Sequence, residues 1–259
     1  MEPRIASLVP SVTELLVDLG LAPWMVARTG FCIHPAQVVR QIPKVGGTKD
    51  VNLAKLERLA PTHVVVNVDE NTRETVDALR RFVPEVVVTH PCDPRDNLAL
   101  YGQMAQVFGG WGEVRARAAQ WTEALQRELE ATAACHWPAR RVLYCIWRDP
   151  WMTVARDTYI SRMLGLVGWQ TWPDVHGGPQ GARRYPRFDL GEALAAPLDE
   201  VLLSTEPYRF GPAHVGQVQA QLRGPGPAPR VRLIDGEMVS WYGSRAVQGL
   251  RYLRTYARA

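Results

Sequence analysis

The stretch that decides the fold runs from Trp111 to Ala134 and reads WGEVRARAAQWTEALQRELEATAA. It contains no proline, and no glycine after Gly112. Its apolar residues recur at three- and four-residue steps, at Val114, Ala118, Trp121, Leu125 and Leu129. This spacing predicts one amphipathic helix. At ~1.5 Å per residue, ~24 residues would extend ~36 Å, enough to connect two lobes. A long surface helix inside a single domain is the alternative.

Short β-rich runs lie on both sides of this segment, with helical stretches between them. The runs are 4–9, 63–68, 85–89, 141–147, 200–204 and 230–234. Such alternation predicts an α/β architecture with mainly parallel strands. We therefore expect an N-terminal α/β lobe over residues 1–110, a linking helix over 111–138 and a C-terminal α/β lobe over 139–259.

The first predicted helix begins directly after the first strand. Pro10 precedes Ser11-Val12-Thr13-Glu14, in which a serine is followed three residues later by a glutamate. This pattern predicts a capping box that opens a helix ending near Gly20.

An internal repeat relates the two halves. The segments Asn52–Glu70 and Asp189–Glu206 both read as cap, short helix, proline, strand and acidic loop. In each, the glutamate follows the proline by nine residues. Two similar lobes that arose by duplication would give this pattern, and chance similarity of two helix–strand units is the alternative.

Composition excludes several classes of protein. Hydrophobic residues make up 46% and charged residues 22%, and no apolar run approaches the ~20 residues of a membrane span, so we expect no membrane insertion. The net charge of +4 comes from 30 basic and 26 acidic residues without a dense basic patch. We therefore expect no nucleic-acid partner.

The four cysteines, Cys32, Cys92, Cys135 and Cys145, show no CxxC spacing and are expected to be buried thiols. The amino terminus, Met1 to Arg4, leads into an apolar run without the basic and hydrophobic regions of a secretory signal. The sequence as it stands predicts a cytoplasmic protein, and a periplasmic or extracytoplasmic one if the true start lies upstream.

Ligands of parallel α/β lobes bind outside the carboxyl ends of the strands. Residues after predicted strands, and aromatic residues in loops, are therefore the candidates for ligand binding. They are Pro10, Ser11, Phe31, His34, Trp147, Arg148, Trp151, Tyr185, Trp241 and Tyr242. Flat rings lining a cleft suit a large planar ligand, although core packing explains any one of them equally well.

No catalytic constellation is present. The six histidines are isolated, and the motifs HExxH, GxSxG, Walker A and GxGxxG are missing. His34 and His90 each precede a proline and could coordinate a cofactor iron or cobalt, but lone histidines are more often structural. We therefore expect no catalytic residues and no metal site.

The ordered set of motifs resembles the helical-backbone, class III substrate-binding proteins of ABC importers, and most closely their cobalamin-binding branch. The stretches that carry the resemblance are RIASLVPSVTE at 4–14, FCIHP at 31–35, KVGGT at 44–48, LAPTHVVV at 59–66, PWMTV at 150–154 and FDL at 188–190. They cover most of the chain in order.

The resemblance implies a periplasmic-binding-protein-like fold in which one long helix joins two lobes. It further implies a non-enzymatic protein that holds a cobalamin-like corrinoid or other tetrapyrrole in the interlobe cleft, with no covalently bound cofactor. Pro10 and Phe31 match pocket positions, and Tyr185 stands where a Trp is common. Thr48 and Asn67 stand where further Trp residues occur in that branch.

In the cobalamin-binding branch, aromatic residues hold the corrin ring, and this set is incomplete here because Thr48 and Asn67 are not aromatic. Trp147, Trp151 and Trp241 are expected to compensate. Arg148 and Arg209 are expected to pair with acidic groups at the periphery of the ligand.

The family also docks onto an ABC permease through one acidic residue on each lobe. Glu70 and Glu206, related by the repeat, are the candidates, with Glu74 as a near alternative. Solvated surface carboxylates, or acids favoured by a helix dipole, are the alternative interpretation.

Three other functions stay open. A ferric-siderophore receptor would use Arg and Tyr side chains. A cytoplasmic enzyme acting on a small or corrinoid-related substrate would need Asp69 or Glu70 near His34 as acid and base. Capture of a bare metal ion would need three or four convergent ligands, which the spacing does not suggest.

Overall fold

The computed structural model describes residues 2–222 and 228–259. It divides into two compact units, each with a four-stranded parallel sheet. Unit 1 comprises Met1–Pro91, Arg95–Leu125 and Tyr242–Arg245, and unit 2 comprises Cys92–Pro94, Gln126–Trp241 and Ala246–Ala259. The predicted α/β class with parallel sheets is confirmed.

Unit 1 has the strand order β2-β1-β3-β4. Its strands are β1 (Ile5–Ser7), β2 (Met25–Arg28), β3 (His63–Asn67) and β4 (Glu85–Thr89). Its helices are α1 (Pro10–Asp18), the 3-10 turn η1 (Ala22–Trp24), α2 (Ala36–Val39), α3 (Leu53–Arg58), α4 (Arg73–Leu79) and α5 (Asp96–Phe108).

Unit 2 repeats this topology with the order β6-β5-β7-β8. Its strands are β5 (Arg140–Cys145), β6 (Trp169–Trp172), β7 (Glu200–Ser204) and β8 (Arg230–Ile234). Its helices are α7 (Tyr159–Gly165), the 3-10 turn η2 (Ala182–Arg184), α8 (Leu190–Ala195), α9 (Pro212–Gln219) and α10 (Gly236–Ser240). The last helix, α11 (Arg245–Arg258), begins with one residue of unit 1 and continues in unit 2.

The internal repeat is confirmed at its helix starts. Asn52 caps α3 by accepting from the amide of Lys55 at 2.9 Å. Asp189 caps α8 by accepting from the amide of Glu192, also at 2.9 Å. The side-chain acceptors compensate for the amides that a helix start leaves without partners, so equivalent sequence positions nucleate equivalent helices.

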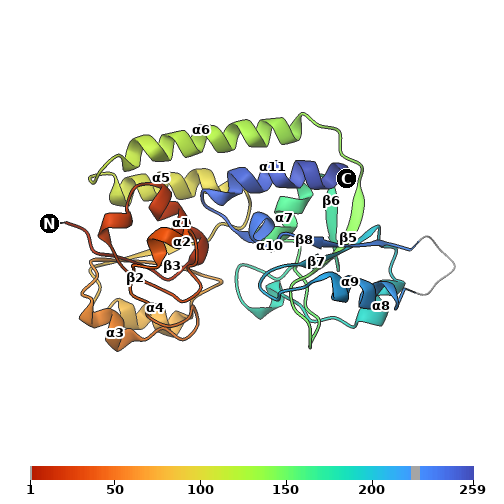
Figure 1. Cartoon of the computed structure of the whole chain (residues 1–259), viewed down its shortest axis with the longest axis horizontal. Helices are drawn as coiled ribbons and strands as arrows, with labels where there is room; N and C mark the ends of the chain where they lie inside the picture. The colour runs from red at the N-terminus through yellow and green to blue at the C-terminus, as the bar shows by residue number, and fades with distance from the viewer. Residues whose placement is uncertain (1, 223–227) are drawn as a thin grey trace. The chain divides into compact units, whose positions relative to one another are not determined.

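One face of each sheet is packed in the same way. In unit 1, Ala6, Val64 and Val66 contact Leu56 of α3 and Leu79 of α4 in one buried cluster. In unit 2, strand residues of β5, β7 and β8 form a cluster with α8 and α9 through Leu190, Ala193 and Val218. Figure 1 shows α3 and α4 on the same side of the first sheet, and α8 and α9 on the same side of the second.

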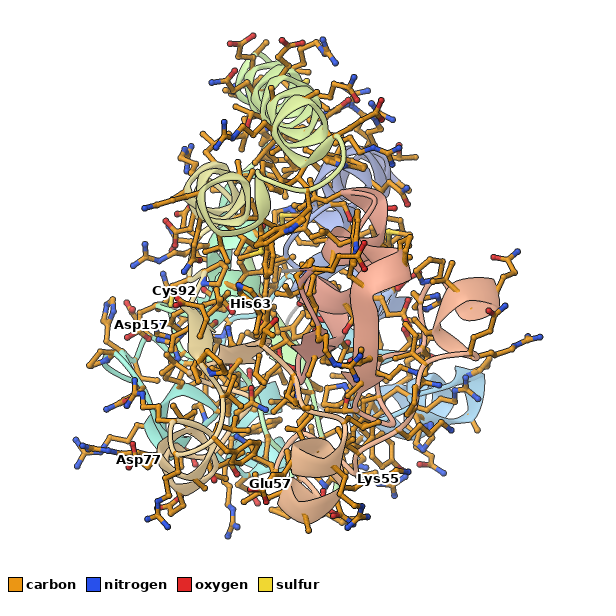
Figure 2. The ribbon with its side chains drawn as sticks, turned by 90° about the vertical axis from the view of Figure 1, so that its left-hand side faces the viewer. Lys55, Glu57, His63, Asp77, Cys92 and Asp157 are labelled. Atoms are coloured by element: carbon orange, nitrogen blue, oxygen red, sulfur yellow. The ribbon has the colours of Figure 1, made fainter. Side chains whose placement is uncertain are left out.

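The outer sides of α3 and α4 are charged. Glu57 on α3 and Asp77 on α4 are exposed, and Lys55 is partly exposed. Figure 2 shows these three side chains pointing away from the ribbon, while His63 lies inside it. The amphipathic pattern thus places apolar residues on the sheet and charges in water.

The predicted long helix is confirmed as α6 (Val114–Ala133), a helix of 20 residues. Val114, Ala118 and Leu125 of its apolar stripe are buried. The division between the units falls within α6, after Leu125. No helix in the described ranges is long and apolar enough to cross a bilayer.

Two strands were missed, and one expectation about local structure was wrong. The strands β2 and β6 were not predicted. The capping box is not formed, because α1 begins at Pro10 with Val9 as N-cap and without a side-chain bond. Proline is pre-organised for the first helical position and has no amide to satisfy. Glu14 instead accepts two bonds from Arg245, at 2.7 and 2.5 Å.

Asp18 ends α1 and supplies a prediction about pH. Burial raises the pKa of its carboxyl above the ordinary value of 3.8, and a hydrogen bond from the Ser244 hydroxyl offsets this only in part. The ionised form is therefore disfavoured in the folded protein, which costs stability at neutral pH. We expect Asp18→Asn to raise the melting temperature at pH 7, because the amide keeps the acceptor for Ser244 without the charge.

The gain in melting temperature should shrink as the pH falls through the pKa that Asp18 has in the folded protein. It should vanish below 3.8, where Asp18 is neutral in both the folded and the unfolded state. Thermal unfolding of the two proteins across this range measures it. Asp77→Asn, at an exposed position on α4, is the control and should change little. A lower melting temperature for Asp18→Asn at pH 7 would contradict the expectation.

Candidate ligand-binding site

The carboxyl ends of the parallel strands define one edge of each sheet, here called its carboxyl edge. In unit 1 this edge is formed by the loops after Ser7, Arg28, Asn67 and Thr89. In unit 2 it is formed by the loops after Cys145, Trp172, Ser204 and Ile234. Polar and aromatic groups at such edges face ligands in α/β proteins, so each edge is described in turn.

The loop after β3 is fixed by two asparagines. The Asn67 carboxamide oxygen accepts from the amides of Asp69 at 2.8 Å and Glu70 at 3.3 Å. Asn71 accepts from the amide of Asn67 at 2.8 Å and donates to the carbonyl of Thr48 at 2.9 Å. These bonds satisfy buried backbone groups, so the loop presents Asp69 and Glu70 from a rigid turn.

Asp69 lies beside a histidine other than the expected one. Its carboxylate is 3.5 Å from Nε2 of His90, and its main-chain carbonyl accepts from Lys49 at 2.7 Å. The enzyme alternative placed Asp69 or Glu70 near His34, which is partly buried in the loop after β2. The structure thus assigns His90 as a neighbour of Asp69.

Phe31 is held in place while its ring stays in solvent. Phe31 is 63% exposed. Its backbone is nevertheless fixed, because the amide of the preceding Gly30 donates to the carbonyl of Gly46 at 2.7 Å. Gly46 has a φ of +101°, and a Cβ at Gly47 would lie 2.2 Å from the Asp50 carboxylate and 3.3 Å from the Phe31 ring. Only glycine permits this turn to pass so close to the ring.

Pro10 and Ser11 lie at the start of α1, directly after β1. Pro10 is partly exposed, whereas Ser11 is only 3% exposed. Within the described residues, the Ser11 hydroxyl has no hydrogen-bond partner.

In unit 2, an aromatic stack rises from the core to the surface. Trp151 stacks on Phe210 with centroids 5.7 Å apart, and Phe210 contacts Tyr208 at 4.6 Å. Trp147 packs edge-on against Tyr208 at 5.6 Å and is 41% exposed. Trp151 is therefore part of the packing beneath the surface, and Trp147 is the ring that reaches solvent.

Arg148 is oriented by its neighbours. One guanidinium nitrogen donates to Gln217 at 2.8 Å, and the group lies 6.0 Å from the centroid of Trp151. Its Nε is 3.5 Å from the carboxylate of Asp149, which is 85% exposed and therefore weakly attracting. Arg209 is exposed after Tyr208, and Tyr185 is partly buried after η2.

The loop after β7 is fixed by a hydroxyl in place of the asparagines of unit 1. Ser204 donates to the carbonyl of Glu206 at 2.6 Å and bonds the hydroxyl of Tyr144 at 2.9 Å. Full burial raises the pKa of the Tyr144 phenol far above its usual range. A Cβ at Gly236 would lie 2.5 Å from the Ser204 oxygen and 2.7 Å from the amide of Glu206, so glycine is required there.

The two repeat-related glutamates accept hydrogen bonds from consecutive aromatic residues. Glu70 accepts from the Tyr242 hydroxyl at 2.7 Å, within unit 1. Glu206 accepts from the indole of Trp241 at 2.7 Å, within unit 2. Trp241 and Tyr242 are 6% and 7% exposed, so they do not add the aromatic surface expected of that loop. Glu74, in the first turn of α4, is exposed.

Exposed apolar side chains gather at the carboxyl edges. The described residues include five exposed large hydrophobic side chains: Phe31, Ile33, Val88, Trp147 and Val175. All except Val88 follow the carboxyl end of β2, β5 or β6. Ile33 and Val175 were not among the predicted site residues, although each is an apolar residue in an otherwise polar or proline-containing loop. Exposed apolar groups at these edges suit an apolar ligand.

Over the described ranges, no group of three or more His, Cys, Asp or Glu side chains is placed to hold a metal ion. The features described at the carboxyl edges are aromatic rings, one oriented arginine and rigid loops.

Comparison with known proteins gives one family. The family model described as periplasmic binding protein matches residues 5–215. An uncharacterized ABC transporter substrate-binding lipoprotein, YvrC of Bacillus subtilis strain 168, is 23% identical over 170 residues. That match covers 63% of this chain and 53% of the relative, so it spans about half of the relative's length.

Solved structures match nearly the whole chain. The periplasmic vitamin B12 binding protein BtuF of Vibrio cholerae has a TM-score of 0.78 at 17% identity and covers 99% of this chain and 96% of its own. The periplasmic heme-binding protein RhuT of Roseiflexus sp. RS-1 gives 0.77 at 20%, with 99% and 100% covered. The heme binding protein HutB of Vibrio cholerae gives 0.78 at 22%, with 99% of each chain covered. Likeness at these identities establishes the fold.

Proposed function

Because the chain belongs to the periplasmic binding protein family, we propose that it binds a tetrapyrrole, either a cobalamin-like corrinoid or haem, as the substrate-binding protein of an ABC importer. The family consists of non-enzymatic binding proteins, so the prediction that the chain is not an enzyme is confirmed on that basis. Similar folds that bind vitamin B12 or heme support the choice of ligand class.

The observation that carries the proposal is the exposure of Phe31 and Trp147 on rigid supports. Both rings follow strand ends, at 63% and 41% exposure, and both are fixed from below by packed loops. A large planar ligand covers such rings at little conformational cost, because each ring has only two side-chain torsions to restrict.

The first experiment is titration of the purified 259-residue protein with cyanocobalamin and, separately, with haem. Calorimetric heat together with a shift in the visible spectrum is expected for one of the two. A ferric siderophore is titrated alongside, because the receptor for such ligands is the competing hypothesis. Absence of heat and spectral change with both tetrapyrroles would overturn the proposal.

Arg148 distinguishes the two tetrapyrroles. Haem carries ionised carboxylates at its periphery, whereas the corrin ring of cobalamin carries neutral amides there. Since Gln217 and Trp151 orient the Arg148 guanidinium, a charge-assisted bond to a carboxylate needs little reorganisation. We expect Arg148→Gln to weaken haem binding about tenfold and to change cobalamin binding less than twofold.

The matched control is Arg73→Gln, which removes an arginine whose side chain is 91% exposed on α4. It should leave both affinities unchanged. Equal losses of haem affinity in the two variants would mean that net charge, and not the position of Arg148, decides the binding.

Delivery to a permease is part of the same proposal. Glu70, Glu206 and the alternative Glu74 stay the predicted docking acids. Glu70 and Glu206 each already accept a hydrogen bond from an aromatic side chain of their own unit. A permease arginine would therefore have to bind the carboxylate without breaking that hydrogen bond. The cytoplasmic or extracytoplasmic location of the protein stays a prediction, which fractionation of expressing cells would test.

A further inference from the structure

A pocket lies in unit 2, where the loop after α6 leads into β5. Its volume is about 380 Å³, and the side chains that matter for its chemistry are Cys135, Trp137, Arg140 and Arg258. Figure 1 shows the end of α11 beside this loop. β5 begins at Arg140, so the pocket is at the amino end of the strand, at the opposite edge of the sheet from Trp147.

The indole of Trp137 forms a fixed wall of the pocket. Its N–H donates to the carbonyl of Thr132 at 2.9 Å, and the Thr132 hydroxyl accepts from Arg254 at 3.1 Å. A Cβ at Gly168 would lie 3.3 Å from the Cβ of Trp137, so the neighbouring chain packs closely against the base of this side chain. The ring is therefore held in one orientation, with the Arg258 guanidinium over it.

The pocket is positively charged. The Arg258 guanidinium lies 5.6 Å from the Trp137 centroid and donates to the Cys135 sulfur at 3.1 Å. In the part of the chain that the structure describes, Arg258 makes no ion pair, and the pocket lining contains no carboxylate. Arg140 shares the buried carboxylate of Glu200 with Arg232, so that cluster has two cations for one anion.

We propose that this pocket binds a small aromatic carboxylate. Its ring would lie against the indole of Trp137, and its carboxylate would accept from Arg258, with Arg140 adding attraction at longer range. The volume falls within the range of small-ligand sites. Since the residues involved belong to unit 2 and lie away from its carboxyl edge, the proposal is independent of the tetrapyrrole site.

The probe pair is benzoate and benzamide, which have nearly the same shape and differ in charge. Calorimetric titration of the 259-residue protein is expected to show benzoate binding at least tenfold more tightly than benzamide. Raising the ionic strength should weaken benzoate binding, because the arginines are only partly shielded from solvent. Arg258→Gln should lose about tenfold in affinity for benzoate and should fold normally, since Arg258 is exposed. Arg73→Gln is the control.

Cys135 provides a second readout at the pocket. The thiols of Cys135 and Cys92 are both partly exposed, so iodoacetamide should alkylate both, and mass spectrometry of peptides separates them. Benzoate is expected to slow alkylation of Cys135 but not of Cys92, and this protection should be lost in Arg258→Gln. Equal binding of benzoate and benzamide, unchanged benzoate affinity in Arg258→Gln, or equal protection of the two thiols would overturn the proposal.

Discussion

Replacing Glu200 by alanine is expected to lower the free energy of unfolding by about 3–5 kcal/mol, because it leaves two guanidinium groups without their shared anion. Glu200 is fully buried at the start of β7. It accepts from Arg140 on β5 and from Nε of Arg232 on β8 at 2.9 Å. The two arginine side chains are only 25% and 17% exposed, so water cannot fully replace the lost partner.

Two aromatic rings disfavour rotation of the Arg232 side chain away from Glu200. Its guanidinium lies 4.1 Å from the ring centroid of Tyr256 and 5.9 Å from that of Trp169. Rotation of the side chain toward water would lose both contacts. We therefore expect Glu200→Gln, which keeps an acceptor without the charge, to lose less stability than Glu200→Ala.

Urea denaturation followed by circular dichroism measures these differences. Glu192→Ala, at an exposed position on α8, is the control and should shift the unfolding free energy by less than about 0.5 kcal/mol. The triple variant R140M/E200L/R232M replaces all three charges with apolar groups and should recover much of the stability. An unfolding midpoint for Glu200→Ala equal to that of Glu192→Ala would contradict the role given to this network.

The sequence predicted six of the eight described strands and missed β2 and β6. The ranges 85–89, 200–204 and 230–234 agree at both ends with β4, β7 and β8, because each is a run of mainly apolar residues between breaks in the pattern. The missed strands, β2 and β6, lie at the edges of their sheets and have four residues each. So short a run carries no readable periodicity, and parallel pairing with a distant strand decides its conformation.

The sequence predicted where the candidate residues lie in the fold better than it predicted which of them are exposed. Placing candidates after strands identified Phe31 and Trp147, because parallel strands end at a common edge. It could not separate exposed rings from buried ones: Trp241 and Trp147 look alike in the sequence, yet they are 6% and 41% exposed. One partner of Glu70 is Tyr242, 172 residues away, a pairing that only the folded chain reveals. Local patterns fix helices and strands, whereas burial depends on such distant contacts.

The double variant Phe31→Ala/Trp147→Ala is expected to weaken binding of the preferred tetrapyrrole about a hundredfold, with each single change contributing about tenfold. Covering a Phe or Trp side chain with ligand is worth about 1.5–3 kcal/mol, and each factor of ten corresponds to 1.4 kcal/mol. Stability should hardly change for Phe31→Ala, because Phe31 is 63% exposed, and should fall modestly for Trp147→Ala, because Trp147 is 41% exposed and packs against Tyr208. Calorimetry with cyanocobalamin and haem gives the affinities, and thermal unfolding checks the fold.

The comparison with Val88→Ala separates ligand contact from general loss of apolar surface. Val88 is 38% exposed but lies within β4 and not in a loop after a strand end. If the position of the rings matters, Val88→Ala should bind tetrapyrrole with unchanged affinity. Undiminished binding by the double variant would show that the exposed rings are not the binding surface, even though the protein belongs to a family of binding proteins. The family would then account for the fold, and the ligand would have to be sought among compounds that need no aromatic contact.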